Sequence, residues 1–162
     1  GFNAIVLIPG NIYGPYDNYS LENSHVIPAL IRKYYEAKRD NKEEIVAWGT
    51  GKPTRDFVYI EDVAEAIIIA LETYEGEDII NISSGTTISI KELVETIAKV
   101  VGYNGKITWD TTKPDGQLYK GFDVSRMKTI LGFEPKNDLE MGLKKTIKWF
   151  EENYDKPGTV RL

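Results

Sequence analysis

The stretch 4–8 is a continuous apolar run, which is typical of a strand buried on both faces of a parallel sheet. The stretch 78–82, with three isoleucines, is a second candidate for a buried strand. Within 55–60, Phe57 and Tyr59 alternate with Val58 and Ile60, so the two sides of this strand should face different surroundings. Further short strands are predicted at 45–48 and 106–109, and 11–15 is predicted to be a loop.

Apolar residues at helical spacing predict helices between these strands. The sequence from Ser89 to Glu92 is a capping box, and Gly102 ends the helix that it opens. Asn23 or Ser24 is the expected cap of the first helix. The other predicted helices cover 25–38, 61–74, a short stretch capped by Ser125 and ending at Gly132, and a last stretch capped by Asn137 or Asp138.

Strands that alternate with helices indicate an α/β fold. The two buried runs lie far apart, and few other segments could pair with them, so we expect the later part of a larger sheet. The chain begins at Gly1 and enters a strand almost at once, which suggests a fragment. No glycine-rich phosphate loop follows any strand.

Composition narrows the possible functions. A net charge of −5 over 162 residues argues against nucleic acid as the main partner. Cysteine is absent, and the single histidine has no nearby set of ligands, so we expect neither a disulfide nor a metal site. No apolar run reaches the ~18 residues of a membrane span, and no signal peptide is visible, so we expect a cytoplasmic protein that does not enter a membrane.

Three motifs carry a family resemblance: "PGNIYGP" from Pro9, "RDFVYIEDVAEAI" from Arg55 and "INISSGTTISIKEL" from Ile80. In this order they resemble the C-terminal half of an extended short-chain dehydrogenase/reductase, of the NAD-dependent epimerase/dehydratase family. "DNYSLENSHVIPALIRK", "VAWGTGKPTRDFVYIEDVA" and "TKPDG" are similar to the GDP-L-fucose synthase family within it.

The resemblance implies a fold and a division of the chain. It implies the C-terminal part of a Rossmann-type doubly wound parallel sheet plus a small α/β substrate-binding domain. In this single fragment, 1–162, about 1–22 and 76–101 would complete the missing cofactor domain. About 23–75 and 102–162 would form most of the substrate-binding domain. The cofactor loop and the catalytic Tyr-x-x-x-Lys pair would lie in the missing first half. Tyr34 and Lys38 have that spacing, which we interpret as a coincidence on the outer face of a helix.

The resemblance also implies a reaction. GDP-4-keto-6-deoxy-mannose would be epimerised at C3 and C5, and NADPH would then reduce the C4 ketone. His25 would be the proton donor, and its usual cysteine partner would have to lie upstream. From the residues alone, a lone histidine near a helix start is more often structural or merely exposed.

Further positions follow from the family pattern. Pro9, Asn11, Ile12 and His25 would reach the nicotinamide end of NADP, or of NAD, which the missing half would mostly bind. The substrate would contact Asn11, Val26, Leu30, Lys33, Trp48, Arg55 and Lys113, with Arg55 at the diphosphate. Six of these seven have a simpler interpretation: Val26, Leu30 and Trp48 as core, Asn11 as a turn former, and Arg55 and Lys113 as solvated charges.

Some positions depart from the family pattern. Lys33 stands where arginine is frequent, Gly10 where threonine is common, and Gln117–Lys120 replace a Thr-Pro-Arg-Lys stretch. These changes leave room for another nucleotide-sugar epimerase or dehydratase, for a non-catalytic nucleotide-sugar-binding lobe, or for an α/β interaction domain without a ligand. We also expect strands 4–8 and 78–82 to expose apolar edges and faces unless the missing half or another copy covers them. The resemblance implies a homodimer for the parent enzyme.

Overall fold

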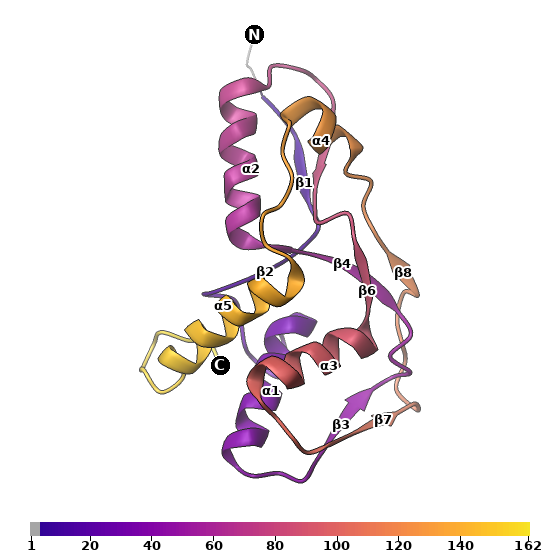
Figure 1. The fold of residues 1–162 in the computed structure, drawn as a ribbon, viewed down its shortest axis with the longest axis vertical. Helices are drawn as coiled ribbons and strands as arrows, with labels where there is room; N and C mark the ends of the chain where they lie inside the picture. Colours follow the sequence, from indigo (N-terminus) through magenta and orange to yellow (C-terminus); the bar gives the residue numbers. More distant parts are fainter. Residues whose placement is uncertain (1–3) are drawn as a thin grey trace.

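A computed structural model describes residues 4–162 and shows an elongated molecule with two ends (Figure 1). The α/β prediction is confirmed. The strands are β1 (Leu7–Pro9), β2 (Asn11–Tyr13), β3 (Glu44–Trp48), β4 (Thr54–Tyr59), β5 (Ile80–Ile82), β6 (Thr87–Ser89), β7 (Lys106–Asp110) and β8 (Tyr119–Lys120). The helices are α1 (Val26–Arg39), α2 (Ile60–Thr73), α3 (Ile90–Val101), α4 (Ser125–Leu131) and α5 (Leu139–Asn153).

The strands form three small sheets. β1 and β5 pair in parallel at the upper end of Figure 1, and β3 and β7 pair in parallel at the lower end. β4 connects the two ends: it pairs in parallel with β2 and β8 and antiparallel with β6. The first strand of the chain therefore ends where the chain changes from one sheet to the next, between Pro9 and Asn11.

The two faces of β4 belong to different cores. Val58 packs into the upper cluster with Val63 and Ala66 of α2 and with the strand β5. Phe57 and Tyr59 pack into the lower cluster, which α1, α3 and α5 enclose. The alternation predicted for this strand is thus confirmed. In the upper cluster α4 packs on β5 and on α2, and in the lower cluster α3 packs on α1.

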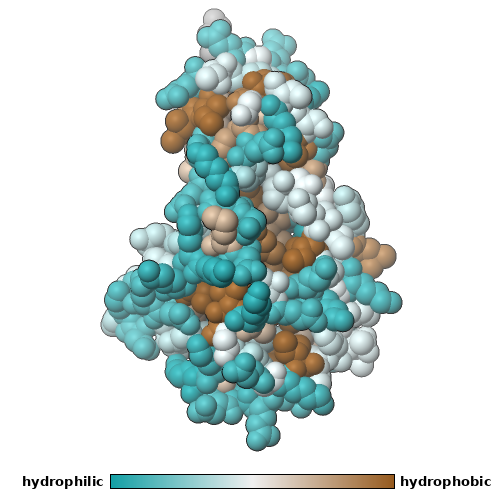
Figure 2. All heavy atoms as spheres, in the orientation of Figure 1, coloured by the Kyte–Doolittle hydropathy of each residue, from teal (hydrophilic) through white to brown (hydrophobic). Residues whose placement is uncertain are grey.

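One face of the β1–β5 sheet is bare. Leu7, paired with Ile80, faces the upper core, whereas Val6, Ile8 and Ile79 on the other face are between 42% and 51% exposed. The prediction that both faces of these strands are buried is therefore wrong for this chain taken alone. The expectation of exposed apolar strand faces is confirmed. α2 adds Ile67, Ile68 and Leu71 to the apolar surface, and hydrophobic atoms are visible beside α2 in Figure 2.

Several helix boundaries follow local signals. Ser89 and Glu92 form the predicted capping box of α3, and Asp138 caps α5 through the amide of Met141. Two predicted caps were wrong. His25 is itself the N-cap of α1 and makes no side-chain capping bond, and Val124 rather than Ser125 precedes α4. No helix in the part of the chain from 4 to 162 is both long and apolar enough to cross a bilayer.

The segment 11–15, predicted to be a loop, begins with strand β2. Its three residues pair with Phe57, Val58 and Tyr59 of β4. Strands of two or three residues such as β2, β6 and β8 carry too few side chains to show a periodicity, so only their pairing with β4 reveals them.

Candidate functional site

A cavity of about 360 Å³ opens where β1 gives way to β2, beside the start of α1. β1 stays with β5, while β2 turns away to β4, and a crevice of this kind at the carboxyl end of a parallel strand is a common ligand site in α/β proteins. The amide of Gly10 donates to the carbonyl of Ile82 (2.8 Å) and fixes this branch point. The cavity is lined by Gly10, Asn11, Ile12, His25, Val26, Ile27, Pro28, Arg55, Phe57 and Lys120.

His25 lies at the mouth of this cavity with its side chain exposed. Its carbonyl accepts the amide of Ala29 (3.1 Å), which places the residue at the first turn of α1. His25 also lines a second cavity of about 280 Å³, on the side of Tyr13, Tyr16 and Ile60. His25 can therefore be reached from two directions.

Two cations meet at the opposite wall. Arg55 on β4 and Lys120 on β8 are direct partners in the parallel pairing of these strands. A guanidinium nitrogen of Arg55 donates to the Thr54 carbonyl (2.8 Å), which leaves other N–H groups of the fork for a ligand. Lys120 Nζ donates to Asn11 Oδ1 (3.2 Å), and Asn11 Nδ2 donates to the Asp56 carbonyl (2.5 Å). Two adjacent cations suit a phosphate or diphosphate.

The carboxylate of Asp56, the next residue along β4, is fully buried. It accepts hydrogen bonds from the amide (3.1 Å) and hydroxyl (2.6 Å) of Ser84 and from the amide of Gly85 (3.0 Å). These bonds tie β4 to the turn that follows β5. Asp56 therefore holds the strand that carries Arg55 against the branch point of the site.

Five predicted site residues line the cavity: Asn11, Ile12, His25, Val26 and Arg55. Sequence reasoning missed the role of Lys120. The signal that could have found it is its position at the end of the stretch 117–120. From the sequence alone, that stretch is interpreted only as a departure from the family pattern. Phe57 was missed as well, because it appeared to be an ordinary core position.

The other predicted positions do not line this cavity. Pro9 is exposed at the end of β1, and Leu30 packs against the lower core. Lys33 Nζ donates to the carbonyl of Val46 on β3 (2.5 Å), and burial, together with nearby Lys42, lowers the pKa of Lys33.

Trp48 and Lys113 lie together and are not among the residues that line this cavity. Trp48 is 69% exposed, and Lys113 Nζ lies 5.6 Å from the centre of its ring. Asp115 ties the loop that carries Lys113 to the loop after Trp48, because it accepts hydrogen bonds from the amide (2.6 Å) and hydroxyl (2.7 Å) of Thr50. We call these two loops the tip; it presents the face of the Trp48 ring with the ammonium group of Lys113 above it. Among residues 4–162, no three histidine, aspartate or glutamate side chains gather as a metal site would require.

Comparison with known proteins places this geometry in a family. Residues 1–83 match the model of the "NAD dependent epimerase/dehydratase family". "Probable GDP-L-fucose synthase 1" from Oryza sativa subsp. japonica is 48% identical over 153 residues, which is 94% of this chain and 46% of that protein. "GDP-L-fucose synthase" from Escherichia coli (strain K12) is 43% identical over 159 residues, 93% of this chain and 49% of that protein.

A solved structure agrees with these relatives. The crystal structure of a GDP-L-fucose synthetase from Naegleria fowleri bound to NADP superposes with a TM-score of 0.90 at 31% identity, over 98% of this chain and 49% of that one. The chain spans about half the length of the curated relatives it matches. The family match shows that this chain belongs to the NAD-dependent epimerase/dehydratase family, within which it resembles GDP-L-fucose synthases.

Proposed function

We propose that this chain is the nucleotide-sugar-binding half of an NADP-dependent epimerase/reductase that converts GDP-4-keto-6-deoxy-mannose to GDP-L-fucose. The observation that carries the proposal is the cavity in which His25 faces two cations, Arg55 and Lys120. An acid–base group and a diphosphate site in one cavity are what an epimerase acting on a nucleotide sugar requires. The similarity to GDP-L-fucose synthases supports the choice of sugar and base.

The nucleotide would extend from this cavity along α1. Arg55 and Lys120 would neutralise the diphosphate, and Val26 and Leu30 would line the path of the nucleoside. Trp48 and Lys113 would meet the substrate at the tip where the aromatic face is exposed. Lys33 would join them by leaving the Val46 carbonyl, which a flexible lysine can do at the cost of one hydrogen bond.

His25 would protonate the sugar carbon on one face. Removal of the proton from C3 or C5 by a base in the rest of the protein leaves an enolate. The imidazolium of His25 then donates a proton to the opposite face of that carbon and becomes neutral. The exposure of His25 between two cavities supports access from the sugar on one side and from the missing half on the other.

The residues at the carboxyl end of β1 fit a nicotinamide cofactor, NADP or NAD. Pro9 is exposed and Asn11 and Ile12 are half-exposed there, so their backbone can be reached by a planar ring. When bound, the reduced cofactor supplies the hydride for the C4 ketone. Under this proposal about 1–22 and 76–101 complete its domain, and about 23–75 and 102–162 mostly hold the substrate.

The bare face of the β1–β5 sheet needs a partner. We assign it to the remainder of a longer protein, or to another copy of the chain, within an assembly that is a homodimer in the parent enzyme. The exposed Val6, Ile8 and Ile79 support this assignment, because a parallel sheet is normally covered on both faces. A cytoplasmic location belongs to the same proposal.

Two alternatives rest on specific residues. The first alternative is a different nucleotide sugar as the substrate. It is supported by the departures from the family pattern at Gly10, Lys33 and the stretch 117–120. The second alternative is a non-catalytic lobe, which would bind the nucleotide sugar through Arg55 and Lys120 and in which His25 would transfer no proton.

Calorimetric titration of GDP and UDP into the chain tests the binding proposal. We expect GDP to bind more tightly than UDP and Arg55→Met to weaken GDP binding by about tenfold. His25→Gln in the longer protein should leave GDP binding unchanged and reduce NADPH oxidation with the keto sugar by at least about a hundredfold. No binding of either nucleotide to a folded chain would overturn the proposal. Full activity of His25→Gln would reject the role of His25, and UDP as the tighter ligand would favour the first alternative.

A further inference from the structure

We propose that Tyr19 is the anchor that positions His25, and that Arg32 on α1 and the C-terminal segment hold this anchor in place. The inference rests on the proposed function only for what His25 does, since the anchor itself is a feature of the fold. Tyr19 lies six residues before His25, in the loop that leads from β2 into α1.

Tyr19 is fully buried, and each of its polar groups has a partner from a different part of the chain. Its amide donates to the carbonyl of Arg161 (2.7 Å), and its hydroxyl donates to the carbonyl of Gly14 (3.3 Å). Its carbonyl accepts a bond from Arg32 (3.2 Å). Its ring packs at 4.5 Å from that of Phe150 on α5, measured between centres. A residue held at four points is a fixed position in an otherwise irregular loop.

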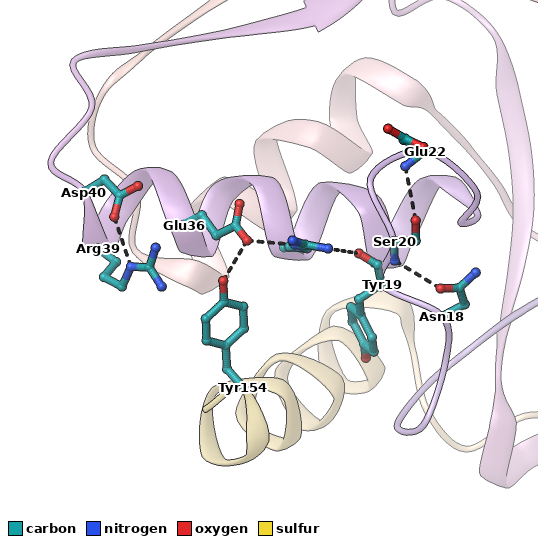
Figure 3. Close-up of polar contacts among 9 residues, drawn as sticks. Asn18, Tyr19, Ser20, Glu22, Glu36, Arg39, Asp40 and Tyr154 are labelled. Atoms are coloured by element: carbon teal, nitrogen blue, oxygen red, sulfur yellow. Dashed lines mark hydrogen bonds and ion pairs between the residues drawn. The ribbon is translucent and has the colours of Figure 1, made fainter. Parts of the chain in front are cut away.

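The side chain of Arg32, which donates to the Tyr19 carbonyl, is held in place by a hydrogen-bond network (Figure 3). Arg32 Nε donates to Glu36 Oε1 (2.7 Å), and the hydroxyl of Tyr154 donates to the same oxygen (2.7 Å). The side chains of Arg32 and Glu36 are each only 19% exposed, so solvent weakens this pair less than it weakens a surface pair. The network joins α1, the loop and the segment after α5.

Between Tyr19 and His25 the hydrogen bonds that the loop makes within residues 4–162 are local. Ser20 donates its amide to Asn18 Oδ1 (3.1 Å), and Asn18 Nδ2 donates to the carbonyl of Asn23 (3.0 Å). Residues 21–23 are exposed, and α1 starts without a side-chain cap. The position of His25 at the cavity mouth is therefore set by α1 on one side and by Tyr19 on the other.

The single histidine makes a direct experiment possible. The imidazole of His25 gives the only histidine ring signals in an NMR spectrum of the 162-residue chain, so they can be attributed to it directly. Arg32→Met removes the bonds to the Tyr19 carbonyl and to Glu36 but keeps an apolar stem of similar length. We expect its His25 signal to move or broaden and the amides of 19–25 to exchange about tenfold faster. Tyr154→Phe, which loses one hydroxyl, should shift the His25 signal in the same direction and speed the amide exchange of 19–25 by about threefold.

Arg126→Met is the matched control. Arg126 also donates to a backbone carbonyl, that of Ile79 (2.9 Å), and pairs with a carboxylate, that of Asp78 (3.1 Å), but it lies on α4. It should leave the His25 signal and the exchange of 19–25 unchanged. In the longer protein, Arg32→Met should lower kcat by about tenfold with KM within about twofold, because the acid is displaced while the cations stay in place.

An unchanged His25 signal and unchanged exchange in both Arg32→Met and Tyr154→Phe would overturn the proposal, and so would an equal change in Arg126→Met. If Arg32→Met does not fold, Tyr154→Phe decides alone. The spectra need no ligand, so failure of the anchor and failure of the proposed function are separate results.

Discussion

Arg55 and Lys120 stand directly opposite each other in the parallel pairing of β4 and β8, although 65 residues separate them in the chain. β8 has only two residues, and its pairing is what brings the lysine to the cavity. Two positive charges lie side by side, and within residues 4–162 no carboxylate is hydrogen-bonded to either, so they would attract an anion. Under the proposed function this anion is the diphosphate of the substrate.

Removal of either cation should therefore weaken nucleotide binding. Lys120→Met should lower the affinity for GDP by about tenfold and reduce the salt dependence of binding, because one charge contact to phosphate is lost. Titration calorimetry at two salt concentrations measures both. Lys106→Met, an exposed lysine on β7, is the control. Wild-type affinity in Lys120→Met would show that this lysine only holds Asn11.

Neutralising Asp56 should destabilise the fold more than neutralising an exposed aspartate just before α4. Asp56→Asn puts an amide where three donors from Ser84 and Gly85 point, and should cost about 3 kcal/mol. Asp123→Asn, which loses one charged acceptor for the Ser125 amide, should cost less than about 1 kcal/mol. Urea unfolding of both variants measures these differences, and equal losses would contradict the structural role of Asp56.

Gly10 and Ser83 should depend on each other. A Cβ at position 10 would overlap Ser83 Oγ and lie 2.9 Å from Ser83 Cβ, and that buried hydroxyl has no hydrogen-bond partner in the described chain. Gly10→Ala should therefore lower the free energy of unfolding by about 1–3 kcal/mol. Added to Ser83→Gly, the same change should cost much less. A double-mutant cycle from thermal unfolding gives the coupling, and strict additivity would reject the contact.

The pair of Arg32 and Glu36 predicts a pH dependence. Burial alone raises the pKa of Glu36, but hydrogen bonds from Arg32 and Tyr154 and the charge of Arg39 outweigh it, so the pKa lies below its ordinary value of 4.5. A lowered pKa stabilises the fold above the ordinary value, and this stability is lost as the pH falls through the lowered one. Between about pH 5 and about pH 3, Glu36→Gln should therefore lose less thermal stability than the wild type does. Glu75→Gln, at an exposed position, should behave as the wild type. Parallel pH profiles for Glu36→Gln and the wild type would contradict the assignment.

The outward face of α2 should control self-association of the chain. Leu71 is 71% exposed, and Leu71→Lys should increase the monomer fraction without lowering the unfolding midpoint by more than about 2 °C. Analytical ultracentrifugation measures the monomer fraction. Ile130→Lys on α4, also at an exposed apolar position, is the control. An equal effect of the two changes would show that the chain does not associate through the outward face of α2.

Local signals in the sequence were enough to locate the helices and the two-sided strand, although two of the predicted helix caps were wrong. Ser89 with Glu92, Gly102, and Asp138 mark helix ends through contacts within one turn, so no distant residue is needed to recognise them. The family motifs likewise identified Asn11, His25, Val26 and Arg55, which the fold brings to one cavity.

Tertiary structure alone decided the rest, because those features depend on partners far away in the chain. Lys120 reaches the site only through β8, and Lys33 turns to the Val46 carbonyl because β3 passes beside α1. Periodicity showed that β1 was apolar, but not that one of its faces would stay bare, since that depends on which elements cover the sheet. His25 marked a helix start in the sequence. Its place between two cavities comes from pairing and packing over distances that no local pattern records.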